Sequence, residues 1–352
     1  MIFSITTFSL IAQDIKSFEN NNVISRINSA YNRGEIDYAT ALAHKAFAVL
    51  DQSQLDPRFY VKVGEIIKCG TPVMMELMEN WDKLSVQSQE RIDHLLKRSI
   101  DRYDAVYISP DGNFNIHYDT TGIDAVPLAD ANENGIPDYV ETFGDIFNYV
   151  WDIEVIELEY DAPMLGGNGM QEVYIENLPS NILGYVSGVD NLQVRNSYSQ
   201  YGNQLALMQV TAAHEFHHEI QLSIHYPSYP STWYMETTSV YMEDYVYDDV
   251  NHYVGYLYDW YNSPWVSITD SDGMHWYSTS IWNFYLEETF GVDIIREVWE
   301  YPNANSIKSL DSILTHHDTS LPDEYEKFET WNYFTGYRSN WHHDTFSEAS
   351  SY

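Results

Sequence analysis

The chain has 352 residues, of which 44% are hydrophobic, so it can bury a core as one large domain or as two smaller ones. Its formal net charge of −36 repels phosphate backbones, and we therefore expect no nucleic-acid partner. No run of about 18 apolar residues occurs, which argues against a membrane-spanning helix. The sequence does not indicate an oligomeric state.

The acidic residues are concentrated in the second part of the chain. Up to Arg102 there are 12 basic and 13 acidic residues, whereas the remainder has 5 basic and 40 acidic residues. One interpretation is a surface adapted to salty or calcium-rich surroundings. A second, compatible interpretation is a boundary near residue 102 between segments with different roles.

The start of the chain suggests export. Residues 2–12 form a short apolar stretch, and Ala12 suits the position before a signal-peptidase cut, although no basic residue precedes the stretch. We predict a signal peptide over residues 1–12 that is truncated at its start, and hence a secreted, extracellular protein. The alternative is an ordinary apolar N-terminus. The single cysteine, Cys69, excludes an intrachain disulfide.

Residues from about 20 to 100 carry apolar side chains at spacings of three and four, which predicts helices. The segment KCGTP over residues 68–72 interrupts this pattern as a turn, and Thr71 and Pro72 can open the next helix.

Polar and apolar residues alternate over 105–109 and 113–118, with Pro-Asp-Gly between them, which predicts a hairpin. Residues 170–177 alternate as well and predict a strand. Beyond Asn203 almost the whole chain reads as helix, with Tyr and Trp on the apolar faces. The order of helices, a small sheet and further helices favours an α+β fold over βαβ units.

Residues 130–141 match the twelve-position loop that binds calcium in proteins. A helix is expected to begin at residue 141, none is expected before the loop, and Pro137 stands where a hydrophobic residue is usual. The alternative is a turn rich in Asp and Asn that caps a helix. The expected calcium ligands are Asp130, Asn132, Asn134, the carbonyl of Ile136, Asp138 and Glu141.

Residues 214–218 contain the HExxH pattern, formed by His214, Glu215 and His218. One helical turn separates the two histidines, so both imidazoles can bind the same metal ion. Zinc at such a pair lowers the pKa of a bound water toward neutrality, and Glu215 can accept its proton. The preceding apolar residues favour a buried helix. Because so short a pattern also arises by chance, the alternative is a pair of structural histidines.

A catalytic zinc needs a third protein ligand and an open coordination position. Glu236 falls 18 residues after His218, on a second predicted helix, and we expect it to be that ligand. The alternative is an exposed acid or a buried salt-bridge partner. His217 lies on another helix face and is interpreted as structural. Glu243, two turns after Glu236, could orient a histidine ligand, although a solvated acid is the preferred interpretation.

Several segments resemble a family of secreted bacterial metallopeptidases of gluzincin type, in which a glutamate on a second helix is the third ligand. The resemblance extends from about Lys68 to Arg338. The matching segments are HEFHHEIQ, WYMETTSVYMED, SPDGNFNIHYDTTG, KCGTP and FETWNYFTGYR.

This resemblance implies zinc on His214, His218 and Glu236, with Glu215 as the general base. It also implies a zincin-like catalytic domain over residues 103–352, with a small sheet, an active-site helix and a helical C-terminal lobe, preceded by a helical segment over residues 13–102. Val240 stands where thermolysin-like enzymes carry Asp, so that part of their arrangement is not expected.

A peptidase also needs a hydrogen-bond donor for the oxyanion of its tetrahedral intermediate. Tyr277 is the preferred candidate and His275 the second; the alternative for both is plain packing. The substrate main chain is expected to pair with an edge strand, formed by residues 170–177 or by residues 181–188.

The expected function is that of a secreted zinc metallopeptidase, with peptides or proteins as substrates and calcium as a second metal. One alternative is a non-catalytic secreted or adhesive module with structural metal sites, against which the intact Glu215 argues. Another is a zinc hydrolase that acts on non-peptide substrates.

Cys69 supports a further hypothesis. Its KCGTP context resembles the cysteine-switch peptide of matrix metallopeptidases, and a thiolate would occupy the open position of a zinc ion. Residues 13–102 would then be a propeptide, with cleavage points at Lys97-Arg98 or Arg102. The preferred alternative is an unreactive buried cysteine in a helical turn, and a third possibility is an intermolecular disulfide.

Overall fold

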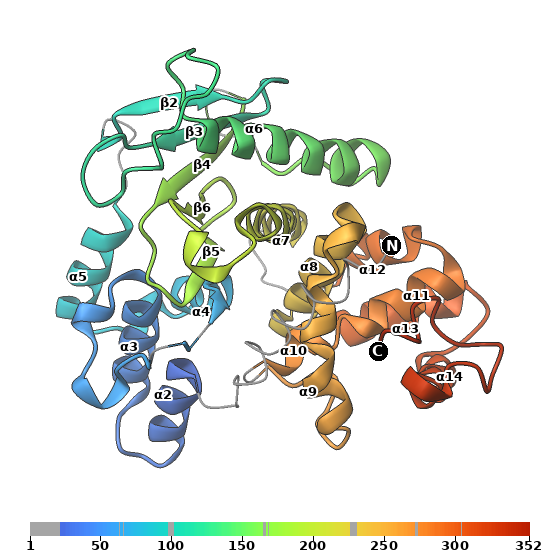
Figure 1. Ribbon diagram of the computed structural model, residues 1–352. Helices are drawn as coiled ribbons and strands as arrows, with labels where there is room; N and C mark the ends of the chain where they lie inside the picture. Colours follow the sequence, from blue (N-terminus) through green and yellow to red (C-terminus); the bar gives the residue numbers. More distant parts are fainter. Residues whose placement is uncertain are drawn as a thin grey trace. The chain divides into compact units, whose positions relative to one another are not determined.

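The computed structural model describes residues 22–62, 64–65, 67–97, 102–164, 167, 169–225, 231–271, 274–303 and 305–352. The chain forms two compact units (Figure 1). The sheet unit comprises Phe18–Ile153 and Ala162–Ile220, and the helical unit comprises, among the described residues, Glu154–Asp161 and Gln221–Tyr352. The predicted signal peptide lies outside the described residues.

The sheet unit is built on a mixed sheet whose described strands run in the order β1-β5-β6-β4-β3-β2. Strand β1 is parallel to β5, and β4 is parallel to both β3 and β6. The pairs β2–β3 and β5–β6 are antiparallel. The strands are β1 (Lys68–Cys69), β2 (Ala105–Ile108), β3 (Phe114–Tyr118), β4 (Gln171–Glu176), β5 (Ile182–Val186) and β6 (Leu192–Arg195).

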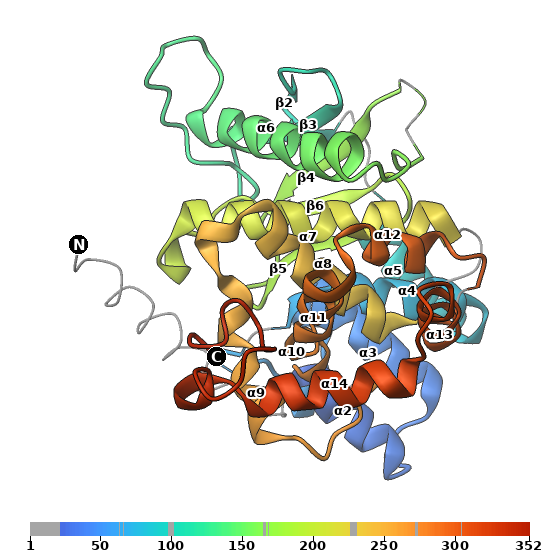
Figure 2. The same ribbon diagram turned by 90° about the vertical axis from the view of Figure 1, so that its right-hand side faces the viewer.

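Two helices cover one face of this sheet. The ring of Phe114 on β3 lies 5.0 Å from Phe147 of α6 and 5.4 Å from Phe216 of α7, measured between ring centroids, so both helices pack on the same face. Figure 2 shows α7 along its length. The helices of this unit are α2 (Val23–Asn32), α3 (Tyr38–Leu50), α4 (Thr71–Glu79), α5 (Val86–Leu96), α6 (Asp138–Trp151) and α7 (Gln204–His225), the last of which ends in the helical unit.

The N-terminal helices share a core with strand β5. Asp37 caps α3 by accepting a hydrogen bond from the backbone N–H of Thr40. Apolar side chains of α2 to α5 form one cluster that also contains Ile182 and Tyr185 of β5. The N-terminal segment is therefore attached to the sheet by apolar burial.

The helical unit consists of short helices around an aromatic core. Trp282, Tyr285 and Phe328 stack or pack edge-on, with ring centroids 5.1 to 5.6 Å apart. The helices are α8 (Thr232–Val246), α9 (Leu257–Asn262), α10 (His275–Ser278), α11 (Ile281–Phe290), α12 (Asp293–Glu300), α13 (Ser306–His316) and α14 (Leu321–Tyr333).

The α+β class is confirmed, and the three strands expected from alternation lie within one residue of their predicted bounds. Three expectations are wrong. Residues 68 and 69 form β1 rather than a turn. Helix α6 connects the parallel neighbours β3 and β4, so the fold does contain a βαβ crossover. Strand β4 lies between β6 and β3, so it is not an edge strand that could pair with a substrate.

Across the part of the chain that the structure describes, no helix has the length and apolar character needed to cross a membrane.

Candidate metal centre

Helix α7 places the two histidines of the HExxH pattern side by side. The Nε2 atoms of His214 and His218 are 3.1 Å apart, and both side chains are buried. Their rings are nearly perpendicular, with centroids 4.7 Å apart. The helical spacing predicted from the sequence is therefore present, with both ring nitrogens directed at one point.

Cys69 on β1 belongs to the same cluster. Its Sγ atom is 3.4 Å from Nε2 of His218, and the ligand atoms of Cys69, His214 and His218 all lie within 4.8 Å of one another. Two nitrogens bound to a tetrahedral zinc at about 2.0–2.1 Å lie about 3.3–3.4 Å apart, and a sulfur bound at about 2.3 Å lies about 3.6 Å from each nitrogen. The three side chains thus fit the donor set of one zinc ion.

Glu215 lies beside this cluster and is 1% exposed. Its Oε2 atom accepts a hydrogen bond from the hydroxyl of Thr71 at 3.0 Å and lies 3.6 Å from Sγ of Cys69. Glycine at position 184 makes room for it, because an added Cβ there would lie 2.8 Å from Cγ of Glu215. The carboxylate therefore points at the position of the sulfur.

Thr71 is not among the predicted site residues, although it contacts Glu215, Cys69 and strand β5. Its hydroxyl donates to Glu215 and accepts a hydrogen bond from the backbone N–H of Val186 at 2.8 Å. Its own N–H points to Sγ of Cys69 at 3.3 Å. Only its position after Cys69 in the KCGTP segment could have indicated this role.

Two other polar residues of α7 are buried, one inside the HExxH motif and one directly after it. Glu219 accepts hydrogen bonds from the backbone N–H of Asn191 at 3.0 Å and from the side chain of Gln171, and burial raises its pKa well above the ordinary value. Burial lowers the pKa of His217 well below its usual range. Glu219 therefore attaches α7 to the sheet, a structural role that no sequence pattern indicates.

The other residues predicted to act at or near the zinc site belong to the helical unit. Glu236 is fully buried on α8, so the alternative of an exposed acid is wrong. Beside it, the carbonyl of Met235 accepts a hydrogen bond at 3.1 Å from Gln221, which lies on α7 one turn after His218. Glu243 is also buried and contacts Nδ1 of His252 at 3.0 Å, so it is not a solvated acid.

Tyr277 and His275 are both buried on α10. The ring of Tyr277 packs against Tyr256, and Nδ1 of His275 lies 3.1 Å from Oδ2 of Asp259. The hydroxyl of Thr237, the residue after Glu236, donates to the carbonyl of Trp276 between the two candidates. Within the helical unit, the predicted third ligand and the predicted oxyanion donors are therefore on neighbouring helices.

The predicted calcium loop is held by hydrogen bonds between its own residues. Backbone N–H groups of Asn134 and Gly135 donate to the carboxylate of Asp130 at 3.1 and 2.8 Å. The side-chain amides of Asn132 and Asn134 both donate to the carboxylate of Glu141, at 3.0 and 2.8 Å. Helix α6 begins at Asp138 rather than at residue 141. Asn132 and Asn134 thus gather on Glu141, whereas Asp130 is held by the backbone of the loop.

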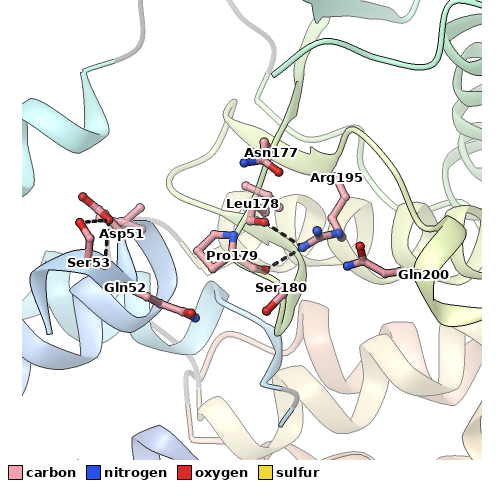
Figure 3. A pocket seen from close by; sticks show the side chains of 10 residues that line it. Asp51, Gln52, Ser53, Asn177, Leu178, Pro179, Ser180, Arg195 and Gln200 are labelled. Carbon is pink, nitrogen blue, oxygen red and sulfur yellow. Dashed lines mark hydrogen bonds between the residues drawn. The ribbon is translucent and has the colours of Figure 1, made fainter. Parts of the chain in front are cut away.

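A separate polar cavity of about 400 Å³ lies where the loop before β5 meets the end of α3. Figure 3 shows Arg195 of β6 reaching from this cavity to the carbonyls of Leu178 and Pro179. None of the predicted site residues lines it.

Comparison with known proteins does not test the resemblance to the gluzincin-type family. No protein-family model matches the chain, and no curated protein matches it.

Proposed function

We propose that this chain is a secreted zinc-dependent peptidase with a zincin-like catalytic domain. The observation that carries the proposal is the position of Glu215, a buried carboxylate that lies beside two metal-competent imidazoles and points at the place where a fourth ligand of their metal would lie. A purely structural metal site has no need of an acid at that place.

In this proposal His214 and His218 hold zinc from α7, and Glu236 is the third ligand. Glu236 is chosen because it is a fully buried carboxylate near the start of α8, a helix held within its own unit by the hydrogen bond from Gln221 to the carbonyl of Met235. Zinc, when bound, would polarise the peptide carbonyl and lower the pKa of the attacking water. Glu215 accepts the proton of that water and passes it to the leaving amine.

Tyr277 remains the proposed donor to the oxyanion, with His275 as the second candidate. The hydrogen bond between Thr237 and Trp276 supports this, because it fixes α10 against the helix that carries Glu236. Asp259 would hold the tautomer of His275 that keeps a proton on Nδ1.

One observation favours a second candidate function. The sulfur of Cys69 lies where an open coordination position is required, and a centre closed by four side chains is typical of structural zinc. The second candidate is therefore a non-catalytic secreted module that binds zinc for stability.

The test combines metal analysis with peptide cleavage. We expect the purified full-length chain to hold about one zinc per molecule, and a Cys69→Ala variant to cleave members of a peptide library in a chelator-sensitive manner. Absence of zinc from both proteins contradicts the metal centre. Zinc without cleavage in either protein supports the structural module instead.

We also propose that residues 130–141 bind calcium. Calcium at a hundredfold excess over its dissociation constant stabilises the native state by about 2.7 kcal/mol, so the melting temperature is expected to fall by about 5 °C when calcium is removed. Scanning calorimetry of metal-stripped protein, with and without millimolar calcium, measures this. A Glu141→Gln variant should lose most of the calcium response. If the melting temperature does not change with calcium, residues 130–141 are instead a turn that caps helix α6.

A further inference from the structure

Strand β1 occupies the edge of β5, which is one of the two segments expected to receive a substrate. The N–H groups of Ile67 and Lys68 both donate to the carbonyl of Asn181, at 2.8 and 3.1 Å, and the N–H of Gly70 donates to the carbonyl of Gly184 at 3.0 Å. Backbone groups that an extended peptide would use by strand addition are therefore already paired within the chain.

The backbone around Cys69 is bent in a way that directs its side chain to the histidines. Lys68 has a φ of 71°, a left-handed conformation that is uncommon for residues other than glycine. The register with β5 shifts between Lys68 and Cys69, as in a β-bulge. Gly70 is required next, because a Cβ there would lie 2.6 Å from Val49 and 2.9 Å from Tyr185.

The sulfur has two polar neighbours at contact distance. Nε2 of His218 lies 3.4 Å away, and the N–H of Thr71 points to the sulfur at 3.3 Å. The sulfur thus lies among donor atoms whose spacing suits one metal ion. Cys69 is 1% exposed, so bulk water does not reach its thiol in this conformation.

We propose that Cys69 is a ligand of the zinc ion and closes the catalytic centre from within the chain. This inference rests on the proposed function. The thiol gives up its proton to Glu215, 3.6 Å from the sulfur, or to solvent, and the sulfur–metal bond takes the place of the bond to the attacking water. At the same time, strand β1 covers the edge at which a substrate would pair. In this form the chain is a latent enzyme.

An inert buried cysteine and a metal ligand differ in how the reactivity of the thiol depends on metal. Burial protects a thiol with or without zinc, whereas ligation protects it only while the metal is bound. Because Cys69 is the only cysteine, a thiol-reactive dye reports on this residue alone. We expect removal of zinc by a chelator to accelerate the reaction of the native protein with such a dye at least about tenfold.

The deciding experiment replaces zinc by cobalt in the full-length protein and in Cys69→Ala. We expect about one cobalt per chain in both, with thiolate-to-cobalt charge-transfer absorption in the near ultraviolet for the unmodified protein only. The cobalt protein with Cys69→Ala should also hydrolyse short peptides at least about tenfold faster.

Each failure has a different meaning. Cobalt bound without thiolate absorption, or a dye reaction indifferent to chelator, contradicts ligation by Cys69 and leaves the proposed peptidase intact. Equal rates of hydrolysis in the two cobalt proteins contradict the closing role. Failure of both proteins to bind metal contradicts the proposed function and, with it, this inference.

Discussion

Replacement of Glu215 by Gln is expected to lower kcat/KM for peptide hydrolysis by at least about a hundredfold in a chain that also carries Cys69→Ala. The amide keeps the size of the side chain and can still accept the hydrogen bond from Thr71. It cannot accept the proton of the attacking water, so the loss should appear in the rate. Zinc content should stay at about one per molecule, since Glu215 is not a ligand.

Glu219→Gln provides the matched control on the same helix. Glu219 is equally buried, and its raised pKa shows that the site favours an uncharged side chain, which glutamine resembles. Its side-chain oxygen can still accept the N–H of Asn191. We therefore expect folding and hydrolysis close to those of the parent. Comparable activity of the Glu215 and Glu219 variants would contradict the assignment of Glu215 as the base.

The second large effect concerns stability. Arg195→Met is expected to lower the free energy of unfolding by about 3–5 kcal/mol. Arg195 is 4% exposed, and its guanidinium donates to the carbonyls of Leu178 and Pro179 at 3.0 and 2.7 Å (Figure 3). It also donates to the carbonyl of Ile182 at 2.8 Å. Methionine fills the space but leaves these carbonyls without their donor. Urea unfolding at fixed zinc and calcium concentrations measures the difference.

Two further variants calibrate this prediction. Arg195→Lys keeps the charge but cannot reproduce the planar donor group, so its effect should be intermediate. Arg33→Met removes an exposed arginine that pairs with Glu35 on the surface, and should leave the free energy of unfolding nearly unchanged. A loss at Arg195 no larger than that at Arg33 would contradict the structural role of the buried guanidinium.

Local periodicity predicts most of the helices and several strands of the fold. The elements that it does not predict depend on contacts between residues distant in sequence. The alternating strands and the helix that carries His214 and His218 follow from local periodicity. Strand β1 has two residues, too few to establish a period, and it is also surrounded by turn residues.

The same reasoning applies to the metal centre. The HExxH pattern predicts that His214, Glu215 and His218 act together, because one helical turn relates them. The hydrogen bond from Thr71 to Glu215 spans 144 positions, and no local pattern contains it. The KCGTP context draws attention to Cys69, although the sequence alone favours an unreactive buried cysteine in a helical turn. That interpretation is wrong about the turn, since the residue lies on β1 in contact with His218.

The contact between Cys69 and His218 joins residues 149 positions apart, which has a consequence for biosynthesis. A ribosome delivers the cysteine long before it delivers the two histidines, and β5, which pairs with β1, also comes later. Until α7 has been made, the thiol has neither its strand partner nor its imidazole neighbours. The single thiol of the protein therefore gains its contact with the histidines only in a chain that has been completed through His218.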